Sequence, residues 1–416
     1  MKDKLLTAPF AALMALAALT ANLVLAPAAR ADITGDGVKI GVLTDMSGPF
    51  ADSTGKGSVE AARMAVEDFG GKVRGKPVTV VVADHQNKPD IAAAAARRWF
   101  DEDGVDVVTD LVGSSVALAV NEVARRANKA TLVTSSGSPA LVGASCSPNS
   151  VLWTFNTRAQ AGALTKALVD QGAKKWFFIT VDYAFGHALE ADTTALVQKF
   201  GGQVMGRVRH PLNTTDFSAL LLRAQASGAD VIALANTGAD TVNATKQAQE
   251  FGIGRQGKQR LATLILHSNE IHSLGQENVE GLLKGSAFEW SLGKERTDWS
   301  RRFYKRVGLM PSQNHAGTYS AVLSYLKAAE AANADTGTAV IDQMKRMPVN
   351  DMFARDGHVR ADGLHVHEMY LVRIKPKAQA KEEWDYYDLL ATIPGIEAYG
   401  APETSECPAV AGQKRS

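Results

Sequence analysis

The stretch Val38-Lys-Ile-Gly-Val-Leu-Thr44, followed by an Ala-rich run over residues 57–69, decides the fold class of this chain. The first segment is short, apolar and rich in β-branched residues, as in strands that are buried on both faces. The second segment has apolar residues at the spacing of an amphipathic helix. Because this alternation continues along the chain, the sequence predicts an α/β fold with parallel sheets flanked by helices.

The alternation can be followed through most of the sequence. Further strands are predicted over residues 78–83, 105–110, 130–134, 176–181, 204–209, 231–235, 261–266 and 369–374. Further helices are predicted over residues 91–101, 116–127, 159–170, 189–200, 217–226, 240–251, 299–307 and 316–332. Residues 402–416 are predicted to form an irregular tail.

The length of the chain predicts two lobes. Without a leader about 385 residues remain, which is too many for one hydrophobic core. The first four strand–helix units end at the turn-rich Cys146-Ser-Pro-Asn149, and a second series starts at Trp176-Phe-Phe-Ile-Thr-Val181. We therefore expect the boundary between the lobes to lie between these two segments.

The first 31 residues have the features of a signal peptide. Lys2 and Lys4 precede an almost wholly apolar stretch over residues 5–26, and Ala29-Arg-Ala31 offers the small-x-small pattern of a cleavage site. The alternative is an uncleaved membrane anchor, since the stretch approaches the about 20 residues of a transmembrane helix. We predict cleavage after Ala31 and export to the periplasm.

Composition narrows the range of partners. Lys and Arg number 45 against 44 Asp and Glu, so neither nucleic acid nor an anionic membrane surface is an expected partner. The two cysteines allow one disulfide in an oxidising compartment but no zinc site of several thiolates. We predict that Cys146 and Cys407 are joined, the alternative being two free buried thiols.

The common enzyme and cofactor signatures are absent from the sequence, so no cofactor is predicted. Gly55-Lys-Gly-Ser58 lacks the spacing of a phosphate-binding loop, because Gly rather than Ser or Thr follows the lysine. His365 and His367 would share one face of a strand, where a metal pair is conceivable. With no carboxylate or thiol at ligand spacing, a solvated strand is the favoured interpretation.

Two serine-rich turns follow neighbouring predicted strands. They are Gly113-Ser-Ser115 and Ser135-Ser-Gly-Ser-Pro139. In open parallel sheets ligands bind beyond the carboxyl ends of the strands, where helix N-termini present free N–H groups. Hydroxyls and N–H groups together would hold a carboxylate. The alternative is ordinary helix capping by serine.

Two strands of the second series are followed by other residue types, aromatic in Asp182-Tyr-Ala-Phe-Gly186 and polar in Asn236-Thr-Gly-Ala-Asp240. The aromatic residues Tyr183 and Phe185 could wall the apolar body of a ligand, while Asn236 and Thr237 supply hydrogen bonds. The alternative places Phe185 in the core and makes Thr237 or Asp240 a helix cap.

These segments, in this order, resemble a known family. Lys39-Ile-Gly-Val-Leu-Thr-Asp-Met-Ser-Gly-Pro49, the two strand ends above and Asp385-Tyr-Tyr387 are similar to periplasmic solute-binding proteins of ABC importers, in the Leu/Ile/Val-binding group. The resemblance implies the type I fold, in which two Rossmann-like lobes joined by a three-segment hinge close on a small ligand. It also implies that residues 32–153 and 285–347 form the first lobe, residues 154–284 and 348–400 the second, and residues 401–416 a tail.

The resemblance also implies roles for individual residues. Ser114, Ser115, Ser135 and Ser136 match the carboxylate contacts of the family, and Tyr183, Phe185, Asn236 and Thr237 match contacts from the second lobe. Amino-acid binders of the family hold the ammonium group with an acidic side chain near His267-Ser-Asn-Glu270. Here Asn269 stands where an acid is expected, although Glu270 is adjacent.

The expected function is delivery of a small carboxylate ligand to an ABC permease by a monomeric binding protein. The ligand is expected to be a branched-chain or hydrophobic amino acid, or an aromatic acid. Two alternatives are a ligand-sensing partner of a membrane receptor and an exported α/β enzyme. The enzyme would need a nucleophile, a base and an acid to converge around a histidine such as His85, His187 or His267.

Overall fold

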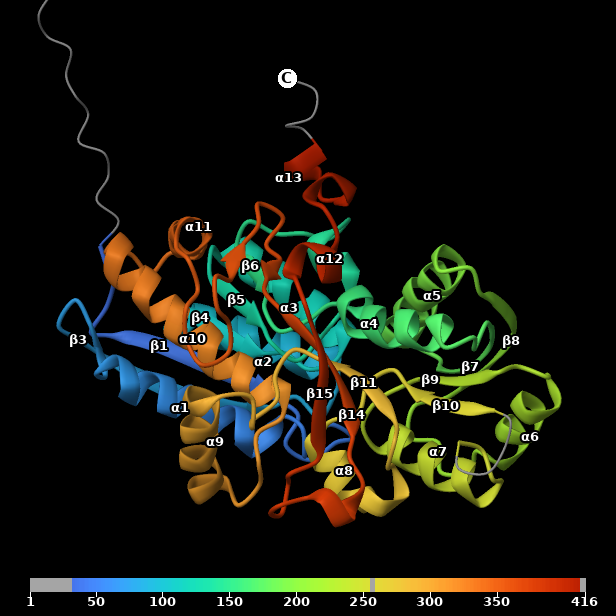
Figure 1. Cartoon of the computed structure of the whole chain (residues 1–416). Coiled ribbons are helices and arrows are strands. Elements are labelled where there is room, and N and C mark those ends of the chain that lie inside the picture. Colours follow the sequence, from blue (N-terminus) through green and yellow to red (C-terminus); the bar gives the residue numbers. More distant parts are fainter. Residues whose placement is uncertain (1–31, 255–258, 412–416) are drawn as a thin grey trace, which may run out of the picture.

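The computed structural model describes residues 32–254 and 259–411, so the predicted leader over residues 1–31 lies outside the described residues. The chain forms two α/β lobes that lie side by side (Figure 1). The first lobe contains the strands β1 to β6 with the helices α1 to α3 and α9 to α11. The second contains β7 to β10 with α4 to α8.

The sheet of the first lobe has six strands in the order β2-β3-β1-β4-β5-β6. All neighbours are parallel except the hairpin of β2 and β3. The strands are β1 (Val38–Thr44), β2 (Lys72–Val73), β3 (Lys76–Asp84), β4 (Val107–Asp110), β5 (Ala130–Val133) and β6 (Ser150–Leu152). The strands β1, β4 and β5 are almost wholly buried, because helices cover both faces of the sheet.

The sheet of the second lobe is parallel, in the order β10-β9-β7-β8. Its strands are β7 (Lys175–Val181), β8 (Gln203–His210), β9 (Val231–Ala235) and β10 (Arg260–Thr263). Successive side chains of β7 point to opposite faces. Trp176 and Phe178 therefore join the core that is continuous with the first lobe, whereas Phe177 and Ile179 join a separate core beneath α6 and α7.

The helices complete both lobes. Those of the first lobe are α1 (Gly55–Phe69), α2 (Pro89–Asp101), α3 (Ser114–Ala127), α9 (Lys294–Val307), α10 (Gln313–Ala332) and α11 (Gly337–Arg346). Those of the second lobe are α4 (Thr157–Asp170), α5 (Ala184–Lys199), α6 (Ser218–Ala226), α7 (Ala239–Glu250) and α8 (Ser268–Leu274). No helix in the described parts of the chain is both long enough and apolar enough to cross a membrane.

An antiparallel sheet in the order β11-β14-β15 joins the lobes. Its strands are β11 (Leu283–Ser286), β14 (Met369–Ile374) and β15 (Tyr387–Ile393), of which β14 and β15 run through the centre of the view in Figure 1. The short pair β12 (His358–Val359) and β13 (His365–Val366) lies beside β6, where Leu364 bridges Leu152. The segment between β6 and α4 connects the first lobe to the second, and the segments between β11 and α9 and between β13 and β14 connect the joining sheet to elements on the side of the first lobe.

His365 in β13 and His367 just after it both contact the segment between β6 and α4. Nδ1 of His365 lies 3.0 Å from the carbonyl oxygen of Trp153, and Nε2 of His367 lies 2.9 Å from that of Thr154. Both side chains are buried, at 0% and 3% exposure, so the expectation of a solvated strand is wrong. Burial lowers the pKa of His367 to about 4, so its imidazole is neutral and acts in packing. No group of three metal-ligating residues occurs among the described residues.

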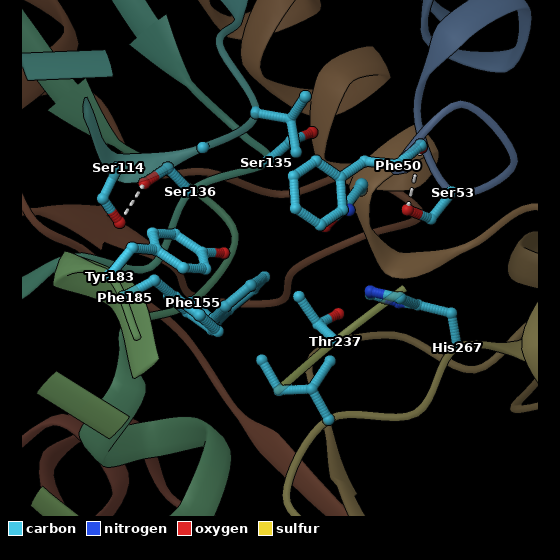
Figure 2. Close-up of a pocket in the computed structure, with 14 residues that line it drawn as sticks. Phe50, Ser53, Ser114, Ser135, Ser136, Phe155, Tyr183, Phe185, Thr237 and His267 are labelled. Carbon is cyan, nitrogen blue, oxygen red and sulfur yellow. Dashed lines mark hydrogen bonds between the residues drawn. The ribbon is translucent and has the colours of Figure 1, made fainter. Parts of the chain in front are cut away.

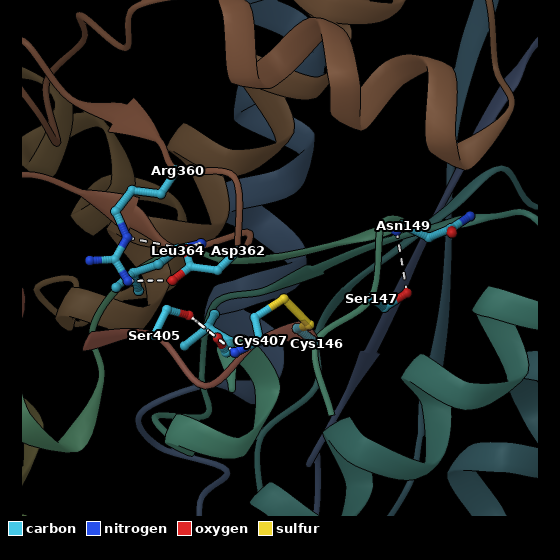
Figure 3. The surroundings of a disulfide bond; sticks show 9 residues. Cys146, Ser147, Asn149, Arg360, Asp362, Leu364, Ser405 and Cys407 are labelled. Atoms are coloured by element: carbon cyan, nitrogen blue, oxygen red, sulfur yellow. Dashed lines mark hydrogen bonds and ion pairs between the residues drawn. A yellow bond between two sulfur atoms is a disulfide. The ribbon is translucent and has the colours of Figure 1, made fainter. Parts of the chain in front are cut away.

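The tail is tied to the first lobe. Cys146 and Cys407 form a disulfide with an S–S distance of 2.07 Å and a sequence separation of 261 residues (Figure 3). The hydroxyl of Ser405 donates to the carbonyl oxygen of Val142, which adds a second contact. The tail contains two short helical turns, η4 (Pro402–Thr404) and α13 (Pro408–Ala411), and α12 (Gly395–Tyr399) precedes it.

Candidate functional site

A narrow cavity of about 20 Å³ lies between the lobes, at the carboxyl ends of both parallel sheets (Figure 2). This volume is smaller than the about 300–1,000 Å³ typical of ligand pockets. Six residues that the sequence predicts for the site line it: Ser114, Ser135, Ser136, Tyr183, Phe185 and Thr237. The cavity is thus formed where strand ends of the two lobes meet.

Two serine turns form one wall of this cavity. The chain leaves β4 through Gly113, whose φ of 90° is readily adopted only by glycine, and α3 begins at Ser114. The hydroxyl of Ser136 lies 3.4 Å from that of Ser114, so the two turns present their hydroxyls together. The first N–H groups of α3 have no partner within the helix and add donors at the same wall.

Ser115 lies apart from the other three serines. It is exposed and does not line the cavity, whereas Ser114 is only 1% exposed. The reason is helical geometry, because successive residues are rotated by about 100° around the axis. Two adjacent serines at the start of α3 therefore cannot both point into the cavity.

Four aromatic rings form the apolar walls: Phe50, Phe155, Tyr183 and Phe185. The rings of Tyr183 and Phe185 pack with their centroids 6.1 Å apart, at the N-terminus of α5. Gly137 allows Phe155 to approach the second serine turn, since a Cβ there would lie 2.6 Å from the Phe155 ring. Val112 and Ile265 complete the apolar lining.

Thr237 and His267 face the cavity from the second lobe, opposite the serine turns (Figure 2). One ring nitrogen of His267 accepts the main-chain N–H of Glu270 in a capping box at the start of α8. Burial, together with the nearby charge of Lys284, lowers the pKa of His267 to about 3. The imidazole is therefore neutral, and its second nitrogen carries a proton that can be donated.

The remaining predicted residues lie near the cavity but do not line it. Asn236 is fully buried, and its side-chain oxygen accepts the hydroxyl of Thr241 at 2.7 Å. Asn269 donates to the carbonyl oxygen of Asp52 at 2.7 Å, a bond between the two lobes. Asn236 therefore supports the strand end, and Asn269 joins the lobes.

The carboxyl group of Glu270 is hydrogen-bonded to the backbone. Its two oxygens accept the N–H groups of Gly238, at 2.9 Å, and His267, at 2.7 Å. Burial raises the pKa of Glu270 to about 8, although both N–H groups lower it. In the described structure this carboxyl group caps backbone groups beside the cavity and does not line it.

Eight lining residues are not among the predicted ligand-binding residues, although Gly113 and His267 lie in segments that the sequence analysis singles out: Phe50, Ser53, Val112, Gly113, Phe155, Ile265, His267 and Asn314. Phe50 and Ile265 follow β1 and β10, so the rule that ligands bind at strand ends, applied to every strand, would have found them. Phe155 lies on a passage between the lobes, and Asn314 lies in the first turn of α10. No local pattern distinguishes these two positions.

The sequence and the fold both match known binding proteins. The family described as periplasmic binding protein matches residues 37–381. A Leu/Ile/Val-binding protein homolog of Brucella melitensis is 29% identical over 297 residues, which cover 71% of this chain and 73% of the relative.

Two solved structures are similar over nearly their whole length. A periplasmic binding protein from Burkholderia mallei is 45% identical with a TM-score of 0.87, and the match covers 90% of this chain and 99% of the other. A branched-chain amino acid ABC transporter periplasmic ligand-binding protein from Burkholderia xenovorans is 38% identical with a TM-score of 0.82, over 90% and 100% of the two chains. Since the family match spans most of the sequence and agrees with the two-lobed fold, this chain belongs to the periplasmic binding protein family.

Proposed function

We propose that this protein binds a small aromatic carboxylate between its lobes and delivers it to an ABC permease. One observation carries the proposal: the cavity combines hydroxyl and N–H donors with four aromatic rings, and none of its lining residues is charged at neutral pH. The donors suit a carboxylate, because an anion at a helix N-terminus gains both hydrogen bonds and the favourable dipole. The aromatic walls suit a planar ring.

An amino acid fits this cavity less well. Its ammonium group would need an acceptor with negative charge, and the lining contains no Asp or Glu. Glu270 is adjacent, but both of its oxygens already accept backbone N–H groups. A buried charge without a partner is costly, so an acid without an ammonium group is favoured.

A branched-chain amino acid is the second candidate. The observation that favours it is the name of the 38% identical Burkholderia xenovorans protein. Titration of benzoate and leucine under the same conditions separates the two, because leucine can bind tightly only if Glu270 turns into the cavity.

His267 and Thr237 suggest where a second polar group of the ligand would lie. They face the serine turns across the cavity, and the neutral imidazole can donate one hydrogen bond. A ring substituent such as a hydroxyl, opposite the carboxylate, would meet these groups. Benzoates that carry a hydroxyl at that position are therefore part of the proposed substrate class.

Several further features belong to the proposal. Membership of the family supports a periplasmic location, and the Ala29-Arg-Ala31 pattern supports cleavage after Ala31, which N-terminal sequencing of the exported protein would test. Catalysis is not proposed, because a ring nitrogen of His267 accepts a backbone N–H group. In a catalytic triad the ring would instead be oriented by a carboxylate. The protein is proposed to act as a monomer with the permease as its partner.

Ser114→Ala tests the site. Loss of a hydrogen bond to a charged group typically costs about 1.5–3 kcal/mol, so the Kd for benzoate should rise by about ten- to a hundredfold. Ser115→Ala is the matched control, since it makes the same change one residue along α3 on an exposed side chain. Calorimetric titration should give an unchanged Kd for the control. Equal effects of both substitutions would contradict the proposed role of the serine turns.

A further inference from the structure

A buried aspartate lies directly behind the serine turns. Asp110 is the last residue of β4 and is 0% exposed. It has a φ of 79°, and Leu111 after it has a φ of 58°, so two non-glycine residues adopt the left-handed region in succession. Such strain is retained where the surrounding structure fixes it, often at functional sites.

The backbone of Asp110 fixes the second serine turn. Its carbonyl oxygen accepts the N–H groups of Thr134, at 3.1 Å, and Ser135, at 3.2 Å. Ser135 lines the cavity, so a single residue separates Asp110 from the ligand site. A change at Asp110 is thereby transmitted directly to the donor wall.

The carboxyl group of Asp110 faces the hydroxyls of Ser135, Thr44 and Ser58. None of these contacts reaches normal hydrogen-bond geometry, so both carboxyl oxygens and the Ser135 hydroxyl are buried without a satisfied partner among the described residues. A buried carboxylate whose oxygens lack donors is costly, whereas the protonated acid can donate to a hydroxyl oxygen. Compared with water, this environment therefore shifts the equilibrium of Asp110 toward the protonated form.

We infer that Asp110 positions the Ser135 hydroxyl for an anionic ligand and takes up one proton from solvent when that ligand binds. This inference rests on the proposed binding of a carboxylate at the serine turns. A hydroxyl has one proton to donate. If Asp110 is ionised, the Ser135 hydroxyl points its proton toward Asp110. The ligand carboxylate then faces the lone pairs of the Ser135 oxygen and the negative charge of Asp110. If Asp110 is protonated, it donates to the Ser135 oxygen, and the Ser135 proton is free for the ligand.

The direction of the pH dependence follows from the groups around Asp110. Burial raises the pKa of Asp110 to about 6, the three hydroxyls lower it, and the carboxylate of Asp45 raises it further. The carboxyl group of Asp45 itself accepts the N–H groups of Gly48 and Phe50, and burial raises its pKa. Near neutral pH, Asp110 in the free protein is thus largely ionised, and a bound carboxylate must raise its pKa further. Affinity should be constant from about pH 5 to pH 6, where the ligand carboxylate is still ionised, and fall by up to about tenfold per pH unit above pH 6.

The test is calorimetric titration of the full-length exported protein with benzoate at neutral pH, in two buffers that differ in ionisation enthalpy. Wild-type protein should take up more than about half a proton per benzoate bound. Asp110→Asn should take up none, since the amide can donate to Ser135 but cannot titrate. Its Kd should stay constant between about pH 6 and pH 7, below the titration of Glu270, whereas the wild-type Kd should rise over the same range.

Two further variants identify the titrating group. Asp351→Asn makes the same change at a half-buried aspartate outside the cavity, which accepts bonds from Ser320 and two backbone N–H groups, and it should retain the uptake. Glu270→Gln should also retain it, because Glu270, with a pKa of about 8, is already protonated near neutral pH. Uptake that persists in Asp110→Asn but disappears in Glu270→Gln would overturn the inference.

The wild-type measurement does not depend on the folding of any variant. Benzoate binding with no proton uptake overturns the role of Asp110 but leaves the proposed function intact. Absence of benzoate binding overturns both.

Discussion

Methyl benzoate and benzamide should bind at least about a hundredfold more weakly than benzoate. Both keep the aromatic ring but lose the negative charge, and the methyl ester also crowds the serine turns. Two charge-assisted hydrogen bonds of about 1.5–3 kcal/mol each are weakened, so the expected loss exceeds that of any single serine substitution. Competition calorimetry against benzoate measures the three affinities on one scale.

A control compound tests the aromatic walls separately from the charge. Cyclohexane carboxylate keeps the charge and loses the flat ring, so it should bind more weakly than benzoate but more tightly than the ester. Equal affinities for acid and ester would mean that the serine turns cap helices and do not hold the ligand. Tighter binding of leucine than of benzoate would show that a group in the cavity accepts the ammonium group of leucine.

Removal of the disulfide should lower the stability of the protein by up to about 5 kcal/mol. The bond between Cys146 and Cys407 closes a loop of 261 residues, and in the chain-entropy model the stabilisation grows with the length of the loop. The double variant Cys146→Ser/Cys407→Ser should therefore unfold at a clearly lower urea concentration than the oxidised wild type.

The affinity of the same double variant for benzoate provides the control. Neither cysteine lines the cavity, so the Kd should not change while the protein remains folded. Titration of the denatured wild type should find no free thiol. An unchanged unfolding midpoint would indicate that the tail contributes nothing to stability.

Most of the fold could be predicted from periodicity, because the central strands are buried on both faces. The predicted segment from Val38 to Thr44 coincides with β1, and residues 231–235 coincide with β9. Most predicted helices begin later than the observed ones, since their first turns are polar or small and lack apolar periodicity. Thus α5 begins at Ala184 instead of residue 189. The edge strand β15 carries a mixed pattern of exposed and buried residues, and it was missed for that reason.

The site could be predicted only in part. The rule that ligands bind at the carboxyl ends of strands identifies Ser114, Ser136 and Tyr183, because it combines local sequence with a general property of parallel sheets. Phe155 enters the cavity from a passage between the lobes, and its position depends on how two separate sheets are oriented. Such contacts are set by tertiary structure, which a local pattern does not encode.

The hydrogen bond from Asn269 to the carbonyl oxygen of Asp52 spans the two lobes and involves protein atoms only. A net contribution of about 0.5–1.5 kcal/mol would raise the resting population of the closed, empty protein by about two- to tenfold. An empty protein in the closed form competes with the loaded protein for the permease. The strength of this bond therefore sets a balance between rapid capture of the ligand and unproductive docking of empty protein at the membrane.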